Sequence, residues 1–477
     1  MPPKKGGKKD LDDGEEVLQA VLIADSFQKH MSPITYSTPK CLLPLVNVPM
    51  IEYTLEMLTS AGVKELFIVC CSHGKQIDEY ISKSQERRPY HFVVHIVEAP
   101  ACKSMGAAMR EVDARGKIRG DFILVHGDVV STVKLEPVLA AHKERREKHK
   151  NKDAILTMVL RASQPTHRNP VFEEEDVAIA VNPESGQLLH YQSMRKSTFT
   201  LDTARFEAHP NIQVRYDVEY IDVCVCSPEV LCLFTDEFDW LDFSKDFLPG
   251  VLTSEILSYQ IYTHVSAGYA GKVNCLSSYS AVSRDIVHRW AFPLVPEVNL
   301  LADTTFKYHN PNIYKETNVT LAQSCTVGED SVFGSGTSVG DGSTITQSII
   351  GRNVSVGANS TILRSFILDG VTVGDNVRIV DSLVCADVML GNGVVLSEGC
   401  VIAAGARIMK DVKLGERVRI AVAPPPNNED EDDDEFFEEG GAGTRRARSC
   451  PRSYGEPPPA RCGATPCATR VGTCEGS

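Results

Sequence analysis

The chain of 477 residues lacks several features that mark common classes of protein. No uninterrupted apolar run approaches the roughly 20 residues of a membrane-spanning helix, so we expect no membrane contact. None of the 15 cysteines forms a CxxC pair, which argues against a structural zinc site. Most cysteines stand in apolar runs, as buried free thiols of cytosolic proteins do. The net charge of −14 argues against direct binding of nucleic acid.

Glycine is missing where a nucleotide-binding loop would need it. The segment Asp25 to Pro49, which follows the first expected strand, contains four prolines and no glycine. A loop that holds phosphates brings backbone N–H groups close to them, and proline has no N–H to offer. The carboxylate of Asp25 would also repel a phosphate. The sequence therefore disfavours tight nucleotide binding by this loop.

An aliphatic or aromatic residue recurs every six residues from Leu321 to Ile420. A period of six fits neither a helix nor an alternating strand, and it predicts a left-handed parallel β-helix with three hexads in each coil. Small or β-branched residues follow four positions after each of these residues, as a narrow interior requires. The register slips by one residue at Ile350, Ile367 and Val384. Stacked coils of this kind tend to build interfaces.

Histidine is absent from the repeats, since none follows His309. Hexapeptide β-helices also occur in acyltransferases, which typically use a histidine as general base. The missing histidine excludes acetyl transfer by that route.

Before the repeats, strands alternate with helices from Val17 to about residue 302, which predicts a Rossmann-like α/β domain with a largely parallel sheet. Clear strands are expected at Val17–Ala24, Glu65–Cys71, Asp121–His126, Ala154–Leu160, Val177–Val181 and Tyr220–Cys226. The basic run Lys143–Lys152 is read as a solvated helix end, with an RNA contact as the alternative.

Five segments are expected along the chain. They are a disordered basic arm (1–16), the α/β domain (17–305), a linker (306–320), the β-helix (321–422) and a disordered tail (423–477). The tail begins with the acidic run Glu429–Glu439, in which only Phe436 and Phe437 are apolar, and continues as an Arg/Pro/Cys-rich stretch without aliphatic periodicity. Segments of such composition do not pack.

Two stretches, Thr35–Ile51 and Leu124–Asp128, resemble the sugar-nucleotide pyrophosphorylases, a nucleotidyltransferase family. The resemblance implies that a glycine-rich loop and a following lysine hold the nucleotide, and that an aspartate after a glycine holds Mg²⁺. This chain keeps Lys40 and Asp128 and has a weak match to the nucleobase loop around Gly106. These three residues are the candidates for a vestigial nucleotide site. Because the glycine loop is lost, we expect no catalytic residue, no cofactor and no metal.

Each candidate also has a plainer interpretation. Asp128 could belong to an ordinary turn after a buried strand, and Lys40 could be a solvated surface lysine.

Several further stretches resemble the epsilon subunits of eukaryotic translation initiation factor 2B, within the same pyrophosphorylase-like family. They are Leu22–Phe27, Val214–Asp217, Cys226–Val230, Thr235–Asp239, Arg289–Leu294 and His309–Tyr314. The gamma subunit shares the same two-domain plan. One departure concerns the Asn-Phe pair that the family associates with exchange activity, which reads Glu237-Phe238 here.

The resemblance implies a cytosolic subunit of the guanine-nucleotide exchange factor complex. Its partners would be the other subunits, especially gamma, and the GTP-binding initiation factor 2. Aromatic and acidic side chains at Glu237, Phe238, Asp239 and Trp240 suit a protein contact, although the aromatics could also lie in the core.

In the epsilon family, exchange activity belongs to a C-terminal domain of stacked helices. The tail of this chain contains no amphipathic helix, so we expect a shortened product that serves as a scaffold without catalysing exchange alone. The alternative is an active sugar-nucleotide pyrophosphorylase.

Overall fold

The computed structural model describes residues 17–25, 27, 30–163, 177–194, 198–201, 209–254, 256–301 and 305–422, together with the backbone of 444–446. The basic arm (1–16) and nearly all of the tail (423–477) therefore lie outside the described residues. Among the described helices, none has the length and apolar character that crossing a membrane requires.

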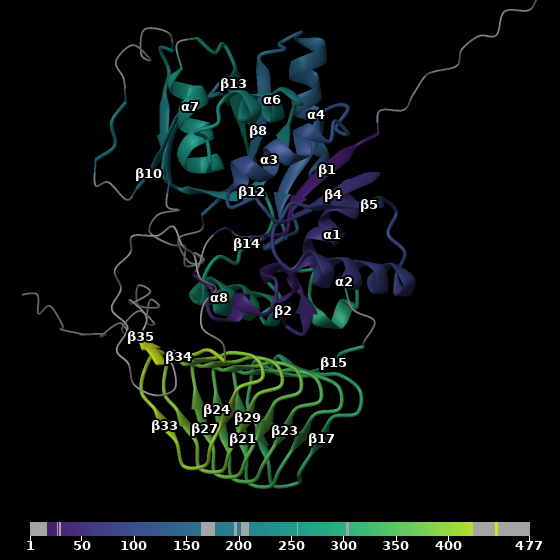
Figure 1. Cartoon of the computed structure of the whole chain (residues 1–477), viewed down its shortest axis with the longest axis vertical. Coiled ribbons are helices and arrows are strands. Elements are labelled where there is room, and N and C mark those ends of the chain that lie inside the picture. The colour runs from purple at the N-terminus through teal and green to yellow at the C-terminus, as the bar shows by residue number, and fades with distance from the viewer. Residues whose placement is uncertain are drawn as a thin grey trace, which may run out of the picture. The chain divides into compact units, whose positions relative to one another are not determined.

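A seven-stranded sheet forms the centre of the N-terminal domain, in the order β13-β8-β12-β6-β1-β4-β5 (Figure 1). These strands are β1 (Gln19–Ile23), β4 (Glu65–Cys70), β5 (Val93–Glu98), β6 (Phe122–His126), β8 (Ala154–Ala162), β12 (Val218–Cys226) and β13 (Gln260–Ser266). β1 runs parallel to β4 and β6, whereas β12 is antiparallel to β6 and β8. The expected mainly parallel sheet is confirmed.

Helices cover both faces of this sheet. Val21 and Ile23 of β1 pack with α3, α6 and α7, whereas Ala20 and Leu22 pack with α1, α2 and α4 on the opposite face. The helices are α1 (Met50–Ser60), α2 (Gly74–Arg87), α3 (Met105–Ala114), α4 (Glu136–Lys143), α6 (Glu229–Asp236), α7 (Leu248–Thr253) and α8 (Leu276–Val287). Because both faces are covered, the strands read as continuous apolar runs.

Shorter elements complete the domain. The strands are β2 (Pro44–Leu45), β3 (Val48–Pro49), β7 (Val129–Ser131), β9 (Val177–Val181), β10 (Leu188–Ser193), β11 (Gln213–Arg215) and β14 (Ala270–Lys272). Short helical turns cover Ile34–Tyr36, Lys40–Leu42, Glu144–Lys148, Phe243–Phe247 and Pro296–Val298.

The hexad repeats form a β-helix with three faces, as predicted (Figure 1). The first face contains β15 (Lys307–His309), β16 (Ile313–Lys315), β19 (Ser331–Phe333), β22 (Ile349–Ile350), β25 (Phe366–Ile367), β28 (Leu383–Val384), β31 (Val401–Ile402), β34 (Val418–Ile420) and β35 (Thr444–Arg446). The second contains β17 (Thr320–Leu321), β20 (Ser338–Val339), β23 (Ser355–Val356), β26 (Thr372–Val373), β29 (Met389–Leu390) and β32 (Arg407–Ile408). The third contains β18 (Thr326–Val327), β21 (Thr344–Thr346), β24 (Thr361–Leu363), β27 (Arg378–Val380), β30 (Val395–Leu396) and β33 (Lys413–Leu414).

The segment 306–320 differs from the expected linker. β16 lies in this segment and pairs with β19, so residues of the segment already belong to the first face. Sequence reasoning missed them because they precede the first regular hexad.

The three register slips of the sequence all fall at one corner, between the third and the first face. Ile345 to Ile350, Ile362 to Ile367 and Ile379 to Val384 each span one residue fewer than a full hexad. The non-glycine residues that turn these corners with positive φ are Gln347, Arg364 and Asp381.

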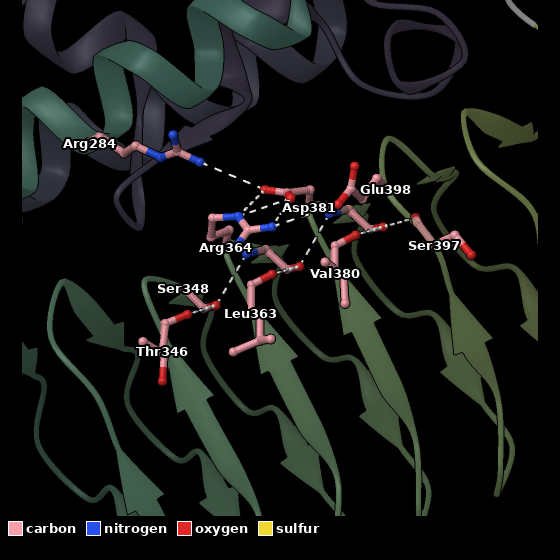
Figure 2. Close-up of polar contacts among 11 residues, drawn as sticks. Arg284, Thr346, Ser348, Leu363, Arg364, Val380, Asp381, Ser397 and Glu398 are labelled. Carbon is pink, nitrogen blue, oxygen red and sulfur yellow. Dashed lines mark hydrogen bonds and ion pairs between the residues drawn. The ribbon is translucent and has the colours of Figure 1, made fainter. Parts of the chain in front are cut away.

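Polar contacts hold the shortened corners together (Figure 2). The amide of Ser365 donates to the hydroxyl of Ser348, 17 residues earlier, and the Ser365 hydroxyl donates to the carbonyl of Leu363. Arg364 donates to both carboxylate oxygens of Asp381 on the next coil. Because the corners follow one another every 17 residues, the same serine contact repeats from coil to coil and forms a ladder.

The first face of the β-helix shares a hydrophobic core with the N-terminal domain. Leu43 and Tyr279 of the domain pack in one cluster with Phe366 and Leu383 of the β-helix. Asn47 adds a hydrogen bond of 3.0 Å from its side-chain amide to the carbonyl of Ile350.

Candidate functional site

Two of the vestigial nucleotide-site candidates, Lys40 and Asp128, meet where β1, β4 and β6 end. In open α/β sheets, ligands bind at the carboxyl ends of the strands. Asp25 follows β1, Cys71 and Ser72 follow β4, and Asp128 follows β6. The parallel pairing of the three strands brings these residues to one edge of the sheet.

Asp25 engages the backbone donors at this edge. One of its carboxylate oxygens accepts hydrogen bonds of 2.6 Å from the amides of Cys71 and Ser72. The other oxygen accepts a bond of 2.7 Å from the Ser72 hydroxyl. Consecutive backbone amides of this kind bind anions, and here a side chain of the chain itself serves as the anion.

Lys40 and Asp128 form a buried ion pair with a separation of 2.5 Å between Nζ and Oδ2. Their exposed fractions are 4 and 5 %, so the interpretation of Lys40 as a solvated surface lysine is wrong. The short turn Lys40–Leu42 follows Pro39, and both Lys40 and Cys41 are buried in it. Cys41 packs against β1 and Gly127, which holds the turn close to the strand ends. Sequence reasoning missed this burial because the residue that Lys40 pairs with lies 88 residues away.

The electrostatics of the pair favour an ionised Asp128. Burial raises the pKa of its carboxyl, but the charges of Lys40, His126 and Lys272 outweigh burial and lower the pKa below its usual value. Its other oxygen, Oδ1, is buried and has no hydrogen-bond partner among the described residues. A second ion pair joins Lys272 to Asp222 of β12. This second pair is a feature that sequence reasoning did not identify.

The residues present do not fit the Mg²⁺ site that the pyrophosphorylase resemblance implies. A divalent cation needs several oxygen ligands, whereas the Asp128 carboxylate already binds an internal ammonium group. No group of three or more metal-ligating side chains occurs among the described residues.

Gly106, the third candidate, lies against the backbone of the loop 237–242. Its amide donates to the carbonyl of Leu241 at 2.8 Å. A Cβ at position 106 would lie 2.0 Å from the carbonyl oxygen of Trp240, so only glycine fits. The position that resembles a nucleobase loop is therefore covered by the chain itself.

The loop 237–242 divides the predicted aromatic contact into two parts. Trp240 packs inward, edge-to-face against Phe234 and Phe247, with ring centroids 6.4 and 5.4 Å away. Phe238 is 71 % exposed, and Glu237 and Asp239 are exposed beside it. Trp240 thus lies in the core, whereas Phe238 is exposed, and the contact of Phe238 with a partner protein stays a prediction.

The side chain of Arg110 on α3 lies against the ring of Phe238. Its guanidinium donates to the carbonyl of Phe234 at 3.0 Å and lies 4.8 Å from the centroid of the Phe238 ring. Asp246 accepts hydrogen bonds from the amides of Leu241 and Asp242 and so fixes the far end of the loop. The loop is therefore pre-organised while it presents a large apolar ring to solvent, which is the property of an interface anchor.

The basic run 143–152 continues α4 into a short helical turn that ends at Lys148, as expected of a helix end. Arg146 lies near Asp121 and donates to Glu229, which neutralises part of the run.

Comparison with known proteins shows which protein families this chain resembles. A family model described as the EIF2B subunit epsilon LbH domain matches residues 310–414, and a nucleotidyl transferase model matches residues 20–167. The chain is 43 % identical over 345 residues to translation initiation factor eIF2B subunit epsilon of Schizosaccharomyces pombe, covering 72 % of this chain and 50 % of that protein.

Two further relatives agree with this match. The epsilon subunit of Dictyostelium discoideum is 40 % identical over 337 residues, which cover 69 % of this chain and 47 % of that protein. The gamma subunit of S. pombe is 26 % identical over 240 residues, covering 48 % of this chain and 50 % of that protein. The chain thus spans about half the length of the curated epsilon relatives that it matches.

Proposed function

Because the chain belongs to the family of eIF2B epsilon subunits, we propose that it serves as a subunit of translation initiation factor 2B, the exchange factor for the GTP-binding initiation factor 2. In this role it supplies assembly surfaces and a contact to the GTP-binding factor, in the cytosol, without binding nucleic acid or membrane. Its other partners are the remaining subunits of the complex, with gamma foremost. The relation to a gamma subunit, which shares the domain plan, supports a pairing of similar folds.

The observation that carries this proposal is the contrast between a filled transferase-like site and an exposed, supported aromatic side chain. At the strand ends where a nucleotide would bind, the Asp25 carboxylate accepts a hydrogen bond from the amide of Cys71. Beside it, Lys40 forms an ion pair with Asp128. Phe238, in contrast, is held by Arg110 and remains open to a partner. Protein contact is favoured over transferase chemistry on both grounds.

Substitution at Phe238 tests the partner contact. Full-length chain carrying Phe238→Ala is compared with wild type for capture of the gamma subunit and of the GTP-binding factor, each purified separately. We expect at least a tenfold loss of affinity for one of them, since buried aromatic anchors dominate interfaces. The control is Tyr216→Ala, which removes another exposed aromatic ring, 80 % exposed, outside the loop. If Phe238→Ala bound both partners as tightly as wild type, the loop 237–242 would not be a partner contact.

Thermal unfolding tests the transferase alternative. A nucleotide bound at a hundredfold excess over its Kd would stabilise the chain by about 2.7 kcal/mol. We expect no shift of Tm with any nucleoside triphosphate and Mg²⁺, because the internal ion pair occupies the site. A clear shift that is lost in Asp128→Asn would restore the enzyme hypothesis.

A further inference from the structure

The last coil of the β-helix, formed by β32, β33 and β34, has an uncovered interior. Its inward-facing residues are only half-buried: Ile408, Val412, Leu414, Val418 and Ile420. The residues at the same places one coil earlier are between 0 and 3 % exposed: Leu390, Val394, Leu396, Cys400 and Ile402. No described strand continues the second or third face beyond β32 and β33. An apolar surface is therefore left at this end, and terminal coils of stacked repeats need a cover.

Unpaired cations surround that apolar surface. Arg407, Lys410, Lys413 and Arg417 are all exposed, and none has an ion-pair partner among the residues that the structure describes. Two arginines on inner coils do have such partners: Arg352 binds Glu316 at 2.9 Å, and Arg364 binds Asp381 at 2.5 Å. The same coil also exposes the carboxylates of Asp411 and Glu416, so its rim is basic on balance. An apolar centre with a net basic rim suits an acidic segment that carries apolar side chains.

The chain itself contains a segment of that composition directly after the last coil. Residues 429–439 include nine acidic side chains and the adjacent Phe436 and Phe437. Six residues lie between Val422 and Glu429, and the seven residue-to-residue steps of an extended chain over that stretch reach about 23–25 Å. The backbone of Thr444–Arg446 returns to pair antiparallel with β34. Both ends of the segment are thereby tethered to the last coil, which raises its local concentration there.

We propose that residues 429–439 dock on the end of the β-helix formed by β32–β34. Phe436 and Phe437 cover the half-buried Ile408, Leu414 and Ile420, while the acidic side chains lie against the rim of Arg407, Lys410, Lys413 and Arg417. This surface lies apart from the loop around Phe238, so the proposal is independent of the proposed partner contact.

Hydrogen–deuterium exchange of the purified full chain tests the docking. The wild type is compared with a variant in which all nine acidic residues of 429–439 are replaced by their amides, and with Phe436→Ser/Phe437→Ser. We expect the amides of β32–β34 to exchange roughly tenfold faster in both variants, with no change at β24 and β27. In the wild type, raising NaCl from about 0.05 to 0.5 M should accelerate the same amides, because salt screens exposed charges.

A charge reversal on the rim supplies the matched control. Lys410→Glu/Lys413→Glu should expose the last coil as the amide variant does. Arg378→Glu reverses an exposed cation on the same face two coils earlier and should leave exchange at β32–β34 unchanged. Equal exchange in wild type and all variants overturns the proposal. Protection that survives the acidic substitutions but rises with protein concentration also overturns it, and assigns the surface to a second copy of the chain.

Discussion

The N-terminal domain and the β-helix of this chain are stabilised by contacts of different range. In the domain, Lys40 pairs with Asp128 across 88 residues of sequence, and among the residues that the structure describes no other pair repeats that contact at a regular spacing. In the β-helix, Ser348 and Ser365 bond across 17 residues, and Ser365 and Ser382 repeat the same bond one coil later. A unique buried contact has no substitute when it is broken, whereas a ladder distributes a disturbance among similar neighbours. The two regions should therefore respond differently to substitution.

The largest effect is expected at the unique ion pair. Lys40→Met leaves a buried carboxylate without its main partner, and such losses cost about 3–5 kcal/mol of the free energy of unfolding. The double variant Lys40→Met/Asp128→Leu should recover most of that loss, since it leaves neither charge alone. Urea denaturation measures both variants.

The exposed pair Lys83–Glu79 provides the control for this measurement. Its side chains are 60 and 68 % exposed, so Lys83→Ala should cost about 0.5 kcal/mol or less. A stability of Lys40→Met within about 1 kcal/mol of wild type would contradict the contrast between the regions.

A second comparison lies within the β-helix. Ile362 on an inner coil is fully buried, and Ile362→Ala should cost about 2–4 kcal/mol through lost burial and the cavity left behind. Leu414 on the last coil is half-buried among the described residues, so in the Phe436→Ser/Phe437→Ser background, where the proposed cover is lost, Leu414→Ala should cost about half as much. Thermal unfolding of both variants checks the order. Equal costs would mean that the last coil is as well covered as the inner ones.

Acid sensitivity should arise in the domain through His142. Burial, followed by the charges of Arg146 and Arg145, lowers the pKa of His142 to about 4. The unfolded chain binds a proton at His142 near pH 6.5, whereas the folded chain keeps this imidazole neutral down to about pH 4. Above about pH 6.5 the difference in pKa costs no stability. As pH falls from about 6.5 to about 4, the free energy of unfolding drops by about 3 kcal/mol at most, because only the unfolded chain gains the proton. His142→Gln should flatten the dependence of unfolding free energy on pH in this window, and an unchanged slope would contradict it.

The smallest effect is expected at the ion pair that joins α8 to the β-helix corner (Figure 2). Arg284 lies 3.9 Å from Asp381 and is 47 % exposed, so Arg284→Ala should cost less than about 0.5 kcal/mol. Arg364→Ala on the same carboxylate should cost somewhat more, up to about 1 kcal/mol, because its hydrogen bonds are shorter and bidentate. Chemical denaturation of the two variants side by side tests this order.

Much of the architecture could be predicted because its signals are local. The hexad period from Leu321 to Ile420 predicts the β-helix, and even its slips at Ile350, Ile367 and Val384 correspond to real shortened corners. Apolar runs such as Glu65–Cys71 predict strands within a residue or two of their bounds. The absence of glycine in Asp25–Pro49 argues against a phosphate cradle, and this stays a prediction for the nucleotide scan to test.

The site was only partly predictable from sequence. Phe238 and Trp240 stand two residues apart and have the same apolar character, yet one is 71 % exposed and the other packs against Phe234 and Phe247. Their difference depends on Arg110 and Gly106 of α3, which approach the loop from more than a hundred residues away in sequence. Sequence patterns within a short window carry no information about such neighbours.

The sequence by itself determined the coil of the β-helix, since contacts that join residues 17 or 18 apart recur there with the period of the chain. Only the tertiary structure decided the fate of Lys40, Asp25 and Asp128. The order of β1, β4 and β6 in the sheet brings their ends together, and burial then makes an ion pair and a carboxylate–amide contact the way to satisfy these charges. Charges that leave water must find partners where the fold places them.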